Sequence, residues 1–176
     1  MTFNQLVQKR ESCRNFSDRP VEKEKLISII ETVRLAPSAC NSQPWHFTLA
    51  TGESARKISA CTHELNMNSF TESCPAFIVI NEEPVKLMAR ISGSLKSQHY
   101  AQIDIGIAAA HICYAATDLD LSTCILGWFN ENQVAQAIGI SPDKRIRLII
   151  AVGYAASDTL REKKRKDISN ILTVIE

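Results

Sequence analysis

Hydrophobic and polar positions alternate along the chain at two spacings, one typical of helices and the other of strands. Helical spacing is clearest over residues 21–35, whose apolar stripe is formed by Leu26, Ile29, Ile30 and Val33. Positions i, i+3, i+4 and i+7 lie on one side of an α-helix, so this segment is predicted to be a helix with one buried face. Pro37 ends it, because the residue before a proline avoids the helical region. Shorter helices are predicted at residues 2–11, 53–61 and 130–138.

One longer segment is apolar on most sides. It covers residues 97–118 and includes the run IDIGIAAAHICYAATDLDL, which begins at Ile103. Asp104, His111 and Asp118 interrupt this run, so it is too polar to cross a lipid bilayer. A helix with so wide an apolar surface belongs in the middle of a protein core. We therefore predict a central core helix and no membrane-spanning segment.

Strands are predicted where β-branched and aromatic residues follow one another between turn residues. The segments with this composition are 45–51, 74–81, 122–127, 145–154 and, at the end of the chain, 168–176. They are too irregularly spaced among the helices for a regular βαβ repeat. The predicted fold class is therefore α+β, with helices packed on a mainly antiparallel or mixed sheet. No repeat or linker divides the chain, so residues 1–176 are expected to form a single domain.

The composition allows an ordinary core and argues against several kinds of partner. Of the 176 residues, 45% are hydrophobic and 22% are charged, and the formal net charge is +1. So small a charge provides no field that would attract nucleic acid or an acidic membrane. Six cysteines are present, but none has the C-x-x-C spacing of a zinc site, so no metal is expected. The N-terminal residues lack the apolar run of a signal peptide, which favours a cytoplasmic protein with reduced thiols.

Two basic segments are candidates for binding phosphate. The chain has no G-x-G-x-x-G or Walker-type motif, so cationic side chains would have to replace a glycine-rich phosphate loop. Near the N-terminus Arg10, Ser12 and Arg14 alternate, and alternate residues of an extended segment point the same way. Guanidinium groups bind phosphate oxygens in pairs, and a serine hydroxyl adds a donor. Near the C-terminus Lys163 and Arg165 have the same spacing in the run REKKRKD. The alternative is that both segments are solvated charged surface.

The segment PSACNSQPW, residues 37–45, is longer than a simple turn requires. Proline, serine and asparagine are common in turns, so a purely structural linker is the alternative. Asn41 and Gln43 each offer hydrogen-bond donors and an acceptor. That combination matches the edge of a heterocycle that contains an imide.

The order of these motifs resembles the flavin-dependent nitroreductase family over essentially the whole chain. Arg-x-Ser-x-Arg comes first, at residues 10–14, and Pro-Ser-x-x-Asn-x-Gln-Pro-Trp follows at residues 37–45. Asp-x-Gly at 104–106, LSTCILGWF and RLIIAVGY then come before the basic run. The first two motifs together are the specific part of the match. The resemblance implies a nitroreductase-like fold, an intertwined homodimer and a bound FMN.

The resemblance also implies roles for the basic residues. Arg10 and Ser12 would hold the FMN phosphate, and Arg14 would lie nearer the ribityl chain and the pyrimidine edge of the ring. Lys163 and Arg165 would complete the phosphate clamp. Phosphate binding would thus combine residues from both ends of the chain.

Further residues would contact or support the flavin ring. Members of the family bind FMN at a homodimer interface, so the other subunit is expected to provide part of the site: Pro37, Ser38, Ala39 and Asn41. Gln43 would support that loop. Leu126 and Gly127 would lie against the isoalloxazine. Asn68 stands where members of the family often have an asparagine that contacts the ring, and Asn66 is the alternative residue for this role. The C-terminal segment would pack on the partner subunit.

The implied activity is that of an FMN-dependent oxidoreductase. NAD(P)H would reduce the flavin, and a nitroaromatic, a quinone or a similar small acceptor would then take two electrons in a ping-pong cycle. FMN carries this chemistry, so no protein side chain is expected to be catalytic. His46 and His99 are interpreted as structural or peripheral, and Cys40 as a packing residue.

Other activities on the same scaffold remain alternatives, because a fold does not determine a reaction. They are reductive dehalogenation, azoline dehydrogenation, and flavin binding by a sensor or storage protein without turnover. At 176 residues the chain is short for the family, whose extra helices usually roof the active site. We therefore expect a pocket that is more open or differently lined.

Overall fold

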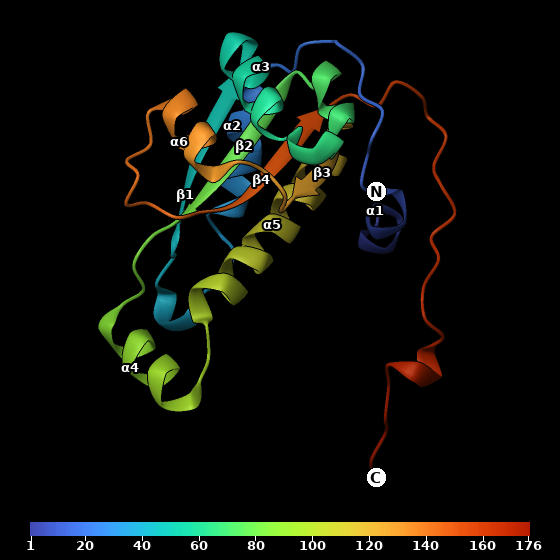
Figure 1. The fold of residues 1–176 in the computed structure, drawn as a ribbon. Helices are drawn as coiled ribbons and strands as arrows, with labels where there is room; N and C mark the ends of the chain where they lie inside the picture. Colours follow the sequence, from blue (N-terminus) through green and yellow to red (C-terminus); the bar gives the residue numbers. More distant parts are fainter.

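The computed structural model describes residues 1–176 and has a four-stranded antiparallel sheet at its centre (Figure 1). The strands are β1 (Trp45–Thr51), β2 (Ala76–Glu82), β3 (Ser122–Leu126) and β4 (Ile146–Gly153). Their order across the sheet is β1-β2-β4-β3, and every neighbouring pair is antiparallel. The predicted α+β class is confirmed, and the sheet is antiparallel rather than mixed.

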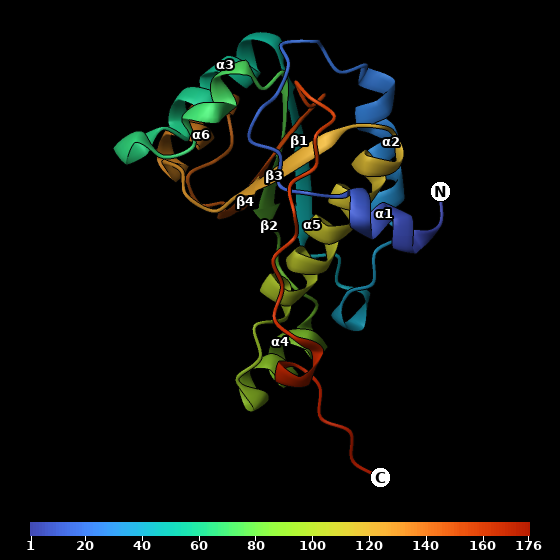
Figure 2. The same ribbon diagram turned by 90° about the vertical axis from the view of Figure 1, so that its right-hand side faces the viewer.

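Helices cover both faces of the sheet. They are α1 (Phe3–Lys9), α2 (Lys23–Val33), α3 (Gly52–Cys61), α4 (Leu87–Lys96), α5 (Tyr100–Asp118) and α6 (Glu131–Ile138). Figure 2 shows α2 and α5 on one face of the sheet, with α3 and α6 on the other. α1 packs beside α5, whereas α4 projects from one end of the molecule (Figure 1).

The alternation of strand side chains divides the core into two layers. Ile78 and Ile80 of β2 pack with Leu26 of α2 and with the inner side of α5. Phe77 and Val79 point the opposite way and pack with α3 and α6. Successive residues of a strand point to opposite faces, so a strand covered on both sides reads as a continuous apolar run. Burying one such side chain stabilises the fold by about 1.5–3 kcal/mol relative to leaving it exposed.

The central helix α5 is confirmed. It lies against the sheet through Ile105, Ile112 and Ala116, each of which is at most 1% exposed. The helix brings residues near its start and residues near its end to opposite ends of the sheet. None of the helices has the length and apolar character that a membrane span requires.

Most other predicted elements are present, with boundaries shifted by a few residues. The helix predicted at 21–35 is α2, which starts at Lys23 with Glu22 as its N-cap. The helix predicted at 130–138 is α6, where the Asn130 side chain accepts from Gln133 N at 3.0 Å. Gly139 ends α6 in the left-handed region, at φ 70°. The Asn130 and Gly139 caps satisfy backbone groups that a helix end leaves unpaired, whereas the Glu22 side chain makes no capping hydrogen bond.

Two predictions need correction. The sequence analysis does not predict α4, although Met88, Ile91 and Leu95 stand at the i, i+3 and i+7 positions of a helix; in the structure Met88 and Leu95 are 68% and 77% exposed. The strand predicted at 168–176 is wrong. The chain forms only a 3₁₀ turn there, at Ile168–Asn170, and the segment extends away from the sheet (Figure 1). A strand needs a neighbour for its backbone hydrogen bonds, and no strand of this chain lies alongside. The exposed apolar side chains of the segment are Ile168, Ile171, Leu172, Val174 and Ile175.

Candidate functional site

The N-terminal basic loop lies along the outer edge of β3. Ser12 pairs with Thr123 in a parallel bridge, and the backbone N–H of Cys13 donates to the Thr123 carbonyl at 2.9 Å. Cys13 is 4% exposed, whereas Ser12 is half-buried and Arg14 is exposed. Alternate residues of an extended segment share a side, so burial of Cys13 leaves Ser12 and Arg14 on the outer side.

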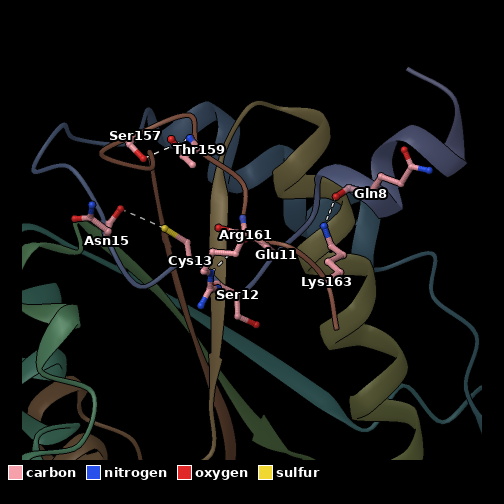
Figure 3. A network of polar contacts seen from close by, with 9 residues as sticks. All are labelled: Gln8, Glu11, Ser12, Cys13, Asn15, Ser157, Thr159, Arg161 and Lys163. Carbon is pink, nitrogen blue, oxygen red and sulfur yellow. Dashed lines mark hydrogen bonds and ion pairs between the residues drawn. The ribbon is translucent and has the colours of Figure 1, made fainter. Parts of the chain in front are cut away.

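The C-terminal basic segment lies beside this loop (Figure 3). Arg161 donates a hydrogen bond to the Ser12 carbonyl, and its Nε lies 3.4 Å from a carboxylate oxygen of Glu11. Lys163 donates to the carbonyl of Gln8 at the end of α1. The contacts of Arg161 and Lys163 join residues 149 and 155 positions apart. The fold therefore brings both ends of the chain to one place.

A hollow of about 260 Å³ lies between the two segments. Its polar lining includes Arg14, Ser157, Thr159 and Arg161. Pockets for drug-sized ligands usually measure about 300–1,000 Å³. The hollow is therefore large enough for part of a mononucleotide, and the remainder would have to lie outside it.

Two buried cysteines lie near the arginines of the loop. Burial raises the pKa of the Cys113 thiol, and the charge of Arg10 opposes this effect. Burial also raises the pKa of Cys124, and the charge of Arg14 is the main opposing influence. Arg10 is the C-cap of α1, which packs beside α5, and Arg14 follows the bridge between Ser12 and Thr123 of β3. Thiols with raised pKa values stay protonated and are poor nucleophiles, so neither cysteine is a candidate for covalent chemistry.

The loop at residues 37–43 is fixed to a different part of the molecule. The backbone N–H of Ala39 points at both carboxylate oxygens of Asp104, at 3.0 and 3.2 Å. The backbone N–H of Lys86 donates to Ser42 Oγ at 3.2 Å. Asp104 and Cys113 are roughly 13 Å apart along the axis of α5, at 1.5 Å per residue. Within one chain, the loop and the basic residues near Cys113 therefore lie at different levels of α5.

Hydrogen bonds inside this loop hold an unusual backbone. Cys40 and Asn41 have φ 51° and Gln43 has φ 49°, in the left-handed region that residues other than glycine seldom adopt. Ser38 Oγ accepts from Gln43 N at 2.9 Å, and Gln43 Nε2 donates to Asn41 Oδ1 at 3.0 Å. Gln43 thus braces Asn41. Cys40 is exposed, so the packing role predicted for it is not seen within this chain.

Asn68 lies next to the end of β3. Its side-chain amide donates to the carbonyl of Trp128 at 3.0 Å and more weakly to that of Thr62 at 3.4 Å. Leu126 as a whole is 3% exposed and lies in the core, so the contact with the ring that is predicted for it is not open in this chain. Gly127 is exposed, and a Cβ at its position would meet nothing within 4 Å. The end of β3 therefore presents accessible backbone beside Asn68.

Some predicted residues are not joined to these groups. Arg165 donates to the carbonyl of its neighbour Lys164 at 2.7 Å, and Asn66 is exposed with no side-chain hydrogen bond. His46 and His99 are exposed, in keeping with a peripheral role. Pro37 is exposed at the start of its loop.

Two residues that the sequence analysis did not assign to the site take part in it. Arg161 joins the basic segments, and Asp104 anchors the loop at residues 37–43. Arg161 stands in the basic run, but nothing in the sequence distinguishes it from its charged neighbours. Asp104 is part of a recognised motif, yet its contact with Ala39 spans 65 positions and depends on tertiary structure.

A larger hollow of about 540 Å³ lies beside α1 and the end of α5. None of the predicted cofactor residues lines it. Among its charged groups, Lys9 is paired with Asp120 at 2.5 Å and Arg19 with Glu22 at 3.0 Å. Because these cations are already paired, its larger volume alone does not make this hollow the better candidate for the cofactor site.

Comparison with known proteins identifies the family of this chain. Residues 7–154 match the model of the nitroreductase family, and the chain belongs to that family. It is 25% identical to an oxygen-insensitive NADPH nitroreductase of Helicobacter acinonychis, over 96% of this chain and 94% of that protein. It is 23% identical to an iodotyrosine deiodinase of Danio rerio, over 98% of this chain and 67% of that protein. A protein of Exiguobacterium sibiricum solved in complex with FMN has the same fold, with a TM-score of 0.82, 21% identity and coverage of 99% and 98% of the two chains.

Proposed function

We propose that this chain is an FMN-dependent oxidoreductase that takes electrons from NAD(P)H and passes them to a nitroaromatic, a quinone or a similar small acceptor. The observation that carries the proposal is the contact between the two basic segments, because Arg161 and Lys163 reach back to the loop at residues 10–14 and its flank. Membership of the nitroreductase family and similarity to a named NADPH nitroreductase support it.

The donors gathered here fit a phosphate monoester. Arg10 and Arg14 belong to the loop, and Arg161 and Lys163 reach the loop and its flank, although the whole chain carries a net charge of only +1. Guanidinium groups and a serine hydroxyl suit phosphate oxygens without a glycine-rich cradle. In this proposal Arg10 and Ser12 bind the phosphate, Arg14 lies nearer the ring, and Lys163 and Arg165 complete the clamp. Arg161 holds the two segments together.

The remaining residues orient the flavin ring. Bound FMN supplies hydride and electron transfer, so the chain needs to bind it, orient it and leave room for a substrate. The open space beside Gly127 admits a flat ring against the backbone of this residue, and Asn68 holds the adjoining backbone through Trp128. Pro37, Ser38, Ala39 and Asn41 of a second copy would cover the ring from the other side.

The proposed functional unit is an intertwined homodimer in which each site uses two copies and each copy is one domain. Two features support it. The loop at residues 37–43 lies at a different level of α5 from the basic residues, so one chain alone does not surround a flavin. Exposed apolar side chains at Ile103 on α5 and at Ile171 and Leu172 near the C-terminus offer surface for a partner.

The six cysteines are free thiols, which suits a reducing cytoplasm.

The proposal is tested by flavin content and turnover. Purified protein, or apoprotein mixed with FMN, should show the flavin absorption bands. Under anaerobic conditions NADPH or NADH should bleach them, and addition of a nitroaromatic or a quinone should restore them. Steady-state rates at several acceptor concentrations should give parallel double-reciprocal lines. A protein that binds no FMN at millimolar concentration would contradict the proposal.

The alternatives predict different results in the same assays. A sensor or storage protein would bind FMN but would stay oxidised when NAD(P)H is added. Reductive dehalogenation is a second candidate because of the similarity to an iodotyrosine deiodinase. A halogenated tyrosine and an azoline therefore belong in the substrate panel beside nitro compounds and quinones. Turnover confined to the halogenated substrate would favour dehalogenation.

A further inference from the structure

Asp104 is a buried carboxylate with a single hydrogen-bond partner. It lies on α5, is 3% exposed, and both of its oxygens lie within 3.2 Å of Ala39 N. No lysine, arginine or histidine forms an ion pair with it. A carboxylate without a cationic partner is costly to bury, so this one stabilises the fold less than an apolar residue of similar size.

The loop held by this carboxylate needs an external anchor. Its left-handed residues Cys40, Asn41 and Gln43 store backbone strain of about 1–3 kcal/mol each. Bonds within the loop, such as Ser42 Oγ to the Ala39 carbonyl at 2.6 Å, fix its internal shape but not its place on α5. A hydrogen bond from a backbone N–H to a charged acceptor is about twice as strong as a neutral one. The Asp104 carboxylate therefore suits the anchoring of a strained loop.

We propose that Asp104 is a positioning residue that holds Ala39 N–H and so sets the place of Asn41 and of the loop at residues 37–43 against FMN. This inference rests on the proposed function, in which that loop covers the flavin of a neighbouring copy. Asp104 acts through Ala39 and does not itself contact the cofactor. Burial raises the pKa of Asp104, and the bond from Ala39 opposes that effect.

The test removes the acceptor, the donor, or both. Asp104→Leu removes the acceptor and fills its space. Ala39→Pro removes the donor, and proline suits this site because Ala39 is the first residue of a 3₁₀ turn that follows extended Ser38. Asp104→Asn keeps one neutral acceptor. Asp118→Leu is the matched control, because Asp118 is exposed on the same helix.

Three measurements are made on each variant. They are exchange of the Ala39 amide in the apoprotein, the dissociation constant for FMN, and the visible circular dichroism of bound FMN. Asp104→Leu should speed Ala39 exchange and raise the dissociation constant, each by about tenfold, as expected for the loss of one charge-assisted bond. Its thermal midpoint should not fall below that of Asp118→Leu. Asp104→Asn should lie between Asp104→Leu and the wild type.

A double-mutant cycle then isolates the contact. If Asp104 acts through Ala39, adding Ala39→Pro to Asp104→Leu should not weaken FMN binding further. Additive losses would overturn the inference, as would Ala39 exchange or an FMN dichroism spectrum in Asp104→Leu equal to that of Asp118→Leu. If Asp104→Leu does not fold, Asp104→Asn decides by the same criteria. Wild-type protein without FMN affinity would instead contradict the proposed function, and that measurement precedes any variant.

Discussion

The side-chain amide of Asn68 donates to the carbonyl of Trp128 at 3.0 Å and so ties the segment after α3 to the end of β3. Asn68 has φ 56° and Asn66 has φ 59°, so both stand in the left-handed region. Glycine adopts this region without strain, and replacing either residue with glycine removes only its side chain. The two positions therefore form a matched pair of variants.

Asn68→Gly should weaken FMN binding or slow flavin reduction by about two- to tenfold, the range for one lost hydrogen bond of 0.5–1.5 kcal/mol. Asn66→Gly should leave both unchanged, because its side chain makes no hydrogen bond in this chain. Titration with FMN and stopped-flow reduction by NADPH measure the two quantities. The reverse order of effects would assign the flavin contact to Asn66.

Removal of the N-terminal cations should abolish the preference for a phosphorylated flavin. Arg10→Ala combined with Arg14→Ala should lower FMN affinity by about a hundredfold, since a hydrogen bond to a charged group contributes about 1.5–3 kcal/mol. Riboflavin lacks the phosphate, so its affinity should fall less, only by the loss of the contact between Arg14 and the ring. Arg56→Ala is the control, because Arg56 is exposed on α3. An equal loss for FMN and riboflavin would indicate that these arginines do not bind the phosphate.

Two arginines of the C-terminal run should differ in their effect. Arg161 bonds to the Ser12 carbonyl and to Glu11, whereas Arg165 bonds to its own neighbour Lys164. Arg161→Ala should release the C-terminal segment from the loop and weaken FMN binding by about tenfold or more, again by the cost of charged hydrogen bonds. Arg165→Ala should have the smaller effect, because Arg165 makes no contact with the N-terminal loop in this structure. Fluorescence titration of both variants compares the two, and a larger effect of Arg165→Ala would support the direct contact inferred from sequence.

Mixing two defective chains should restore one site in each mixed dimer. The mixed dimer contains one Arg14→Ala chain and one Asn41→Ala chain. If each site uses Arg14 of one chain and Asn41 of the other, one site carries both substitutions and the other site carries neither. Activity should therefore approach half of the wild-type value per mixed dimer, while each variant alone stays low. Co-expression with two different purification tags yields the mixed species. Failure of every mixture to recover activity would contradict a shared site.

The contact between Tyr154 and Glu22 should make the free energy of unfolding depend on pH. Tyr154 Oη donates to Glu22 Oε2 at 2.6 Å, and this bond is the main reason that the pKa of Glu22 falls from 4.5 to about 2. The charged form is favoured in the folded state, so the contribution is complete above pH 4.5 and is lost as pH falls towards 2. Glu22→Gln should therefore be less stable than the wild type at pH 6, and the difference should shrink across that window. Urea unfolding at several pH values measures it, with Glu24→Gln as the exposed control on the same helix. A difference that does not change with pH would contradict this assignment.

Local patterns were enough to predict most of the secondary structure. The stripe that includes Leu26 and Val33 predicts α2, and Asn130 and Gly139 mark the two ends of α6, because periodicity and caps act over a few residues. The sequence analysis does not predict α4, whose large apolar side chains have helical spacing but are exposed in this chain. Local patterns also fail for the segment 168–176, whose β-branched residues suit a strand that has no neighbour in this chain.

The sequence by itself determined the family resemblance, the apolar runs of the core and the residue types of a flavin site, since each can be read from nearby positions. Only the tertiary structure decided that Arg161 meets Glu11 and Ser12, that Asn68 rather than Asn66 touches the end of β3, and that Asp104 anchors Ala39. These contacts join residues 60 to 150 positions apart. Their partners are chosen by how the helices pack on the sheet, because a side chain's charge or hydrogen-bonding capacity says what it can bind but not what the fold places beside it.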